Sequence, residues 1–173
     1  NVKNAKNLLE IAKRNNLTLF VGSIFLYHSI LKKLKDISRN EQIKFLYFDW
    51  KKFGTFNEKL TFDLLTHYII ITNELVGKPK KIIVHVSKGV ITKCDILSLE
   101  MKYSNNLECF IVINRVSSTK QRSIIIKTSK NLYQWKDEIL FKFNKNQLTY
   151  KEFFVPKTSP LKNECKEFLK NMT

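Results

Sequence analysis

The sequence has few of the residues that metal sites, disulfide frameworks and phosphate-binding turns require. Among 173 residues there are four glycines, three prolines and three cysteines. Cys94, Cys109 and Cys165 show no C-x-x-C spacing, and the three histidines do not complete a set of metal ligands. We therefore expect neither a metal site nor a disulfide framework.

Glycine is too scarce for a nucleotide-binding turn. Neither G-x-G-x-x-G nor G-x-x-x-x-G-K-[ST] occurs in the chain. Only Gly22 follows the first expected strand, and the residues after it, Ser23, Ile24 and Phe25, include no lysine that could meet a phosphate. The sequence therefore predicts no nucleotide cofactor.

No nucleophile and no acid–base pair stands out. His28, His67 and His85 lie within apolar helical or strand patterns, where a packed histidine is more common than a general base. Asp49 ends an expected strand, but no second carboxylate or histidine accompanies it. We therefore expect no catalytic activity.

Acidic residues are outnumbered by basic ones. The chain has 31 lysines and arginines against 15 acidic residues, a formal charge of +16, while 43% hydrophobic residues suffice for a core at this length. Such a charge favours a polyanionic partner, with RNA, DNA or an anionic membrane surface as the candidates. The longest apolar run, Leu17 to Tyr27, covers 11 residues, well short of the roughly 20 that a membrane span needs, so no membrane partner is expected.

Helical and strand patterns alternate along the chain. The expected helices are 5–12, 24–37, 60–75 and 90–103, and the expected strands are 17–21, 43–48, 81–86, 109–113 and 123–126. This alternation indicates an α/β fold, a three-layer, open and mostly parallel sheet flanked by helices.

The pattern weakens toward the C-terminus. Residues 135–143 fit either a helix or a strand, 150–155 an edge strand, 156–160 a linker, and 161–172 a short lysine-rich helix or tail. We therefore expect one α/β domain over residues 1–155 and a basic C-terminal tail over 156–173.

The order of these segments resembles a known family. The run Leu9 to Ser23, LEIAKRNNLTLFVGS, is similar to the helix, polar break and Leu-Phe-Val-Gly-Thr strand of the bacterial-type small-subunit ribosomal protein two family. Trp50, followed by Gly54-Thr55 and Asn57, is similar to that family's Trp, Gly-Gly-Thr and Thr-Asn-Phe loop. The resemblance runs from Ala5 to Glu138, with the family's long helical hairpin reduced to residues 58–77.

The resemblance implies a structural constituent of the small ribosomal subunit that binds ribosomal RNA and neighbouring ribosomal proteins, without catalysis, cofactor or small-molecule substrate. Residues with A/T-rich codons, lysine, asparagine and isoleucine, are abundant, which is typical of a mitochondrial member. We expect the contact surface at the carboxyl ends of the first two strands, with two lysines beside it: Ser23, Trp50, Lys51, Lys52, Gly54, Thr55, Asn57, Lys127 and Lys130.

Two other classes of protein remain open. A catalytically inactive RecA-like subunit of a multiprotein complex also begins with helix, strand, Gly-Ser, helix and strand. An α/β enzyme whose pocket the sequence does not reveal is the third alternative.

Overall fold

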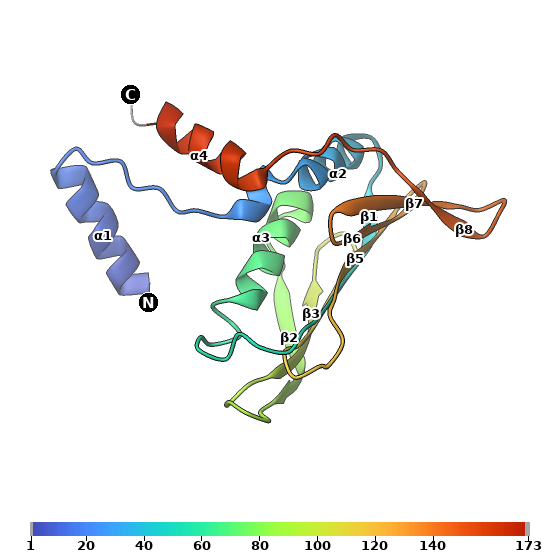
Figure 1. Ribbon diagram of the computed structural model, residues 1–173, viewed down its shortest axis with the longest axis horizontal. Helices are drawn as coiled ribbons and strands as arrows, with labels where there is room; N and C mark the ends of the chain where they lie inside the picture. The colour runs from blue at the N-terminus through green and yellow to red at the C-terminus, as the bar shows by residue number, and fades with distance from the viewer. Residues whose placement is uncertain (1, 172–173) are drawn as a thin grey trace.

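The computed structural model describes residues 2–171 and shows a single sheet with helices packed beside it (Figure 1). Its strands are β1 (Ile43–Lys51), β2 (Lys81–Lys88), β3 (Ile96–Lys102), β4 (Glu108–Asn114), β5 (Gln121–Thr128), β6 (Leu132–Lys136), β7 (Ile139–Asn144) and β8 (Thr149–Glu152). Its helices are α1 (Val2–Arg14), the 3-10 turn η1 (Ile24–Tyr27), α2 (Ser29–Asn40), α3 (Leu64–Val76) and α4 (Pro160–Lys170).

The eight strands lie in the order β2-β3-β4-β1-β5-β6-β7-β8. Only β1 and β4 pair in parallel, whereas every other neighbouring pair is antiparallel. The expected class, an open α/β sheet flanked by helices, is confirmed, but the expectation of mostly parallel strands is wrong. Most consecutive strands are joined by connections of a few residues, too short for the crossover that a parallel pair needs.

Two expected elements differ from the structure. Residues 90–103, expected as a helix, form a turn and strand β3, in which Leu97, Leu99 and Met101 point to the covered face of the sheet. Residues 17–21, expected as a buried strand, pair with no strand among the described residues, and Leu17 and Val21 are exposed. The ambiguous stretch 135–143 is a hairpin, since β6 and β7 meet at the turn around Asp137.

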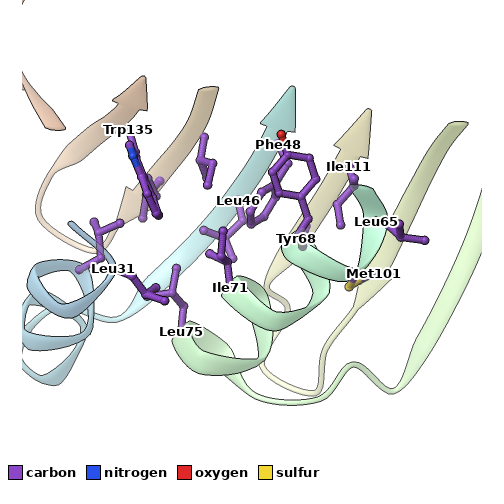
Figure 2. Packing of buried hydrophobic residues seen from close by; sticks show 14 of the residues in the cluster. Leu31, Leu46, Phe48, Leu65, Tyr68, Ile71, Leu75, Met101, Ile111 and Trp135 are labelled. Carbon is purple, nitrogen blue, oxygen red and sulfur yellow. The ribbon is translucent and has the colours of Figure 1, made fainter. Parts of the chain in front are cut away.

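Helices α2 and α3 cover one face of the sheet (Figure 2). Leu31 of α2 and Ile71 of α3 point toward Leu46 and Phe48 of β1, and all four side chains are buried. This stripe of apolar residues at helical spacing meets every second residue of the strands. The covered face is therefore the hydrophobic core.

A buried arginine ties together the loops at one end of the sheet. Arg115, which follows β4, donates from Nε to Asp95 at 2.9 Å and from its terminal nitrogens to the carbonyls of Thr55, Glu58 and Cys94 and to the hydroxyl of Thr92. Burial acts to raise the pKa of Asp95, but hydrogen bonds from Thr92, Val90 and Ile91 outweigh it and lower that pKa. Because both charges are buried and satisfied, this ion pair fixes the loop between β1 and α3.

The two ends of the described chain differ in packing. Every described side chain of α1 except Ala12 is exposed, whereas α4 lies against η1, where Asn163 donates to the carbonyl of Tyr27 at 3.3 Å. Residues 1, 172 and 173 lie outside the description, and the division of the chain at residue 155 stays a prediction. Within residues 2–171, none of the helices combines the length and the apolar character that crossing a bilayer demands.

Candidate active site

The loop residues expected at the contact surface lie near the carboxyl end of β1. Trp50 and Lys51 end that strand half-buried, and Lys52, Thr55 and Asn57 follow it exposed. Gly54 has φ +122°, a conformation that side chains rarely adopt, while Ser23 is buried before η1 with no partner for Oγ among the described residues. The role of these residues in contacting a partner stays a prediction.

The two lysines expected beside this loop lie elsewhere. Lys127 is paired with Phe45 at the beginning of β1, whereas Lys51 at its end is paired with Gln121. The length of the strand separates the two positions by roughly 20 Å. Lys130 lies in the turn after β5, beyond Lys127. The expectation that Lys127 and Lys130 border the Trp50 loop is therefore wrong, because β5 runs antiparallel to β1.

Two histidines that the sequence analysis set aside come together instead. They belong to a group of side chains from η1, α2, α3, β5 and the β6–β7 hairpin, which we call the His67 cluster: Phe25, His28, His67, Arg122, Trp135 and Glu138. Phe25 is its centre, with ring centroids 5.0 Å from His67 and 6.2 Å from Trp135 and with the Arg122 guanidinium 5.4 Å above its ring.

His28 has both ring nitrogens engaged. Nδ1 accepts a hydrogen bond from the backbone of Ile30 at 3.2 Å and so caps helix α2. Because Nδ1 accepts, the hydrogen of the neutral ring lies on Nε2, which donates to Glu138 at 2.9 Å. Burial lowers the pKa of His28. These contacts define a structural role for His28.

His67 differs from His28 because one of its ring nitrogens lacks a partner. It lies in the first turn of α3, half-buried, and Nδ1 makes no hydrogen bond within residues 2–171. Burial lowers its pKa, Asp63 four residues earlier acts to raise it, and Arg122 acts to lower it. The imidazole is therefore neutral at neutral pH.

Arg122 and Glu138 complete the electrostatics of the cluster. Arg122 donates to Glu138 and to the carbonyl of Asp137, both at 2.9 Å. Partial burial acts to raise the pKa of Glu138, but the hydrogen bonds from His28 and Arg122 prevail and lower it. The carboxylate thus holds Arg122 between the two histidines, where its positive charge favours neutral imidazoles.

Space for a ligand lies outside the cluster rather than within it. The cavity enclosed by Phe25, Tyr68, Arg122 and Trp135 measures only about 10 Å³. A cavity of about 410 Å³ is lined by Asn57, Leu60 and Thr61, which precede α3, and by Thr92 and Arg115. His67 itself lines neither of these two cavities.

The sequence contained one signal for this site. Asp63 and His67 are four residues apart at the beginning of a helix, the spacing at which two side chains face each other. The apolar residues around His67 favoured packing instead. Arg122 and Glu138 could not be linked to it from the sequence, because strand pairing brings them there.

None of the four glycines forms a phosphate-binding turn for a dinucleotide cofactor. A Cβ added at Gly22 would meet Oε1 of Glu164 at 2.8 Å, and one at Gly89 would meet the carbonyl of Thr92 at 2.3 Å, so both close approaches serve the chain's own packing. Gly77 ends α3 and Gly54 lies in a loop, so neither glycine opens a helix toward a phosphate. Residues other than these four glycines would have to hold the phosphates of a nicotinamide cofactor.

Comparison with known proteins shows that the fold is similar to parts of several solved oxidoreductase structures. No protein-family model and no curated protein sequence matches the chain. Among solved structures, UDP-N-acetylglucosamine 3-dehydrogenase GnnA from Acidithiobacillus ferrooxidans is 18% identical with a TM-score of 0.78, over 97% of this chain and 57% of that one. A protein described as an NADPH-dependent oxidoreductase from Desulfitobacterium hafniense is 12% identical with a TM-score of 0.82, over 100% and 61%.

An inositol dehydrogenase homolog from Azotobacter vinelandii, complexed with NADH and myo-inositol, is 16% identical with a TM-score of 0.69, over 92% of this chain and 49% of that one. The chain thus spans about half to three fifths of the length of these structures. At such identities the likeness establishes the fold alone.

These neighbours contradict the ribosomal interpretation. The predictions of a structural constituent of the small ribosomal subunit, of ribosomal RNA and protein partners, and of no enzymatic activity or small-molecule substrate are wrong, since the similar structures are dehydrogenases and oxidoreductases. The Leu-Phe-Val-Gly match that carried the resemblance is no strand of the sheet. Because residues 17–21 form no strand, the helix–strand beginning expected of a RecA-like subunit is not found either. The mitochondrial location stays a prediction.

Proposed function

We propose that the chain forms the substrate-binding and proton-transfer part of an oxidoreductase that acts on a hydroxyl group of a small polyhydroxylated molecule. The observation that carries the proposal is His67, a half-buried, neutral imidazole whose Nδ1 has no partner among the described residues, held beside Asp63 and Arg122. The likeness to a sugar-nucleotide dehydrogenase and to a homolog complexed with myo-inositol supports this substrate class.

The chemistry required of this chain is a proton transfer. Oxidation of a secondary alcohol removes a proton from oxygen and a hydride from carbon. The neutral imidazole of His67 would accept the proton, and Asp63, at the N-cap of α3, would stabilise the imidazolium that forms. The hydride would pass to NAD or NADP, which the assay below supplies as the oxidant.

Substitution of His67 tests this role. In the protein as it occurs, His67→Asn should lower the rate of NAD- or NADP-dependent oxidation of myo-inositol or UDP-N-acetylglucosamine by about 100-fold or more, because the acceptor for the hydroxyl proton is lost. The matched control is His85→Asn on β2, an exposed histidine that contacts Glu100. Equal rates for parent and His67→Asn, or no oxidation of either substrate by the parent, would count against the proposal.

A titration tests the site without turnover. The imidazole resonances of His67 should report a pKa below the ordinary value of about 6.5, lower still in Asp63→Asn and higher in Arg122→Gln, since these two charges act in opposite directions. A His67 pKa at the ordinary value that changes in neither Asp63→Asn nor Arg122→Gln would argue against His67 as the base.

A further inference from the structure

A second cavity, remote from His67, opens between the β7–β8 hairpin and the turn that joins β5 to β6. Its volume is about 460 Å³, within the range of small-molecule sites. We call it the hairpin cavity; it is lined by Lys130, Asn131, Lys142, Phe143, Asn144, Lys145, Asn146, Lys151, Glu152 and Phe153. Four of these ten residues are lysines from three separate segments.

The four lysines lack acidic partners within residues 2–171. None of Lys130, Lys142, Lys145 and Lys151 takes part in an ion pair there, although Lys51 lies 3.2 Å from Asp49 and Lys102 lies 3.5 Å from Glu100. Of these four lysines, Lys142 alone has a described contact with a ring: its Nζ lies 5.9 Å from the centroid of Tyr133. The cavity therefore carries an uncompensated positive charge.

The strand register makes this charge costly. Lys142 of β7 is directly opposite Lys151 of β8, so their side chains project from the same face of the hairpin. Like charges at such positions destabilise a strand pair. Glu152, the only acidic residue in the lining, is opposite Phe141 instead of a lysine. No side chain of the hairpin offsets the repulsion between Lys142 and Lys151, and a bound anion would do so.

We propose that the hairpin cavity binds a small anion with two or more phosphate groups. Lysine ammonium groups are compact charges suited to phosphate oxygens. The four lysines line one open cavity, whereas a nucleic-acid backbone needs charges distributed along a track. Asn144 and Asn146 add amide groups to the lining. The site is independent of the His67 cluster.

Binding of inorganic tripolyphosphate tests the assignment. Measured by calorimetry at low ionic strength, the dissociation constant should rise about tenfold in Lys142→Gln/Lys151→Gln, as expected when two charge contacts are removed. The matched control is Lys81→Gln/Lys102→Gln, which removes another pair of lysines opposite each other, on β2 and β3. The control should change the dissociation constant by less than about twofold, since the net charge is the same in both variants.

Four further results decide the proposal. Without anion, Lys142→Gln/Lys151→Gln should unfold at the same temperature as the parent or higher, because it removes a repulsion. Tripolyphosphate should raise the melting temperature of the parent and of the control by more than that of Lys142→Gln/Lys151→Gln. Equal weakening of binding in both double variants would overturn the proposal in favour of net charge. Tighter binding of single-stranded oligonucleotides that grows with their length and survives Lys142→Gln/Lys151→Gln would overturn it in favour of a polyanion surface.

Discussion

The two faces of the sheet use the same strands differently. On the covered face, Leu46 and Phe48 are fully buried beneath α2 and α3. On the opposite face, Phe45 and Tyr47, their neighbours in β1, are only half-buried, and Phe45 packs against Phe110 at a centroid distance of 6.0 Å. Apolar character alone therefore did not decide which side chains form the core; the position of the helices did.

The largest expected effect follows from this difference. Phe48→Ala should lower the free energy of unfolding by about 3–5 kcal/mol, because it opens a cavity in the covered face. Phe45→Ala, the matched change on the opposite face, should cost about 1 kcal/mol, since its ring already contacts solvent. Denaturant unfolding measures both. Equal losses would mean that the opposite face is as deeply packed as the core.

A smaller effect on stability is expected from protonation of His28, a buried histidine. The pKa of His28 is lower in the folded protein than in the unfolded chain, so the unfolded chain binds the proton more readily. Stability is therefore complete above about pH 6.5 and falls as the pH drops through that value, until His28 is protonated in the folded state as well. Protonation of Nδ1 also removes the cap of α2.

Thermal unfolding between about pH 7 and pH 5 checks this dependence. His28→Ala should reduce the loss over that range to the part that His67 contributes through its own lowered pKa, and it should lower stability at pH 7 by about 1 kcal/mol through the missing cap. His85→Gln, at an exposed position on β2, should leave the loss unchanged. An acid loss of unchanged size in His28→Ala would mean that His28 contributes nothing to it.

The smallest effect is expected in α1, which belongs to neither face. Leu8 is 57% exposed although it lies at helical spacing with Leu9 and Ala12. Leu8→Ser should change the free energy of unfolding by less than about 0.5 kcal/mol, measured in the same denaturant series. A loss comparable to that of Phe48→Ala would show that α1 packs against the sheet.

Local patterns predicted the elements whose burial is one-sided. Strand β1 and helices α2 and α3 were predicted because their apolar residues recur at a single period. Strand β3 was missed although Leu97, Leu99 and Met101 alternate with polar residues, since Val90, Ile91 and Cys94 extend the same stretch at helical spacing. The choice between the two periods depended on β2 and β4, which pair with β3 on either side.

The candidate site was less predictable than the fold. His67 and Asp63 are neighbours on one helix and could have been linked from their spacing. Arg122 and Glu138 reach the same place from β5 and the β6–β7 hairpin, through antiparallel pairing that the expected parallel sheet excluded. The mistaken strand direction also placed Lys127 and Lys130 at the wrong end of the sheet.

By itself, the sequence determined that this chain folds around an apolar core, with helices and strands at periods set by backbone geometry, and that it carries a large positive charge. Only the tertiary structure decided the direction of the strands, the meeting of His67 with Arg122, and the gathering of four lysines around one cavity. The physical reason is that side-chain period is a local property, whereas strand pairing joins residues far apart in the chain and settles which charges share a site.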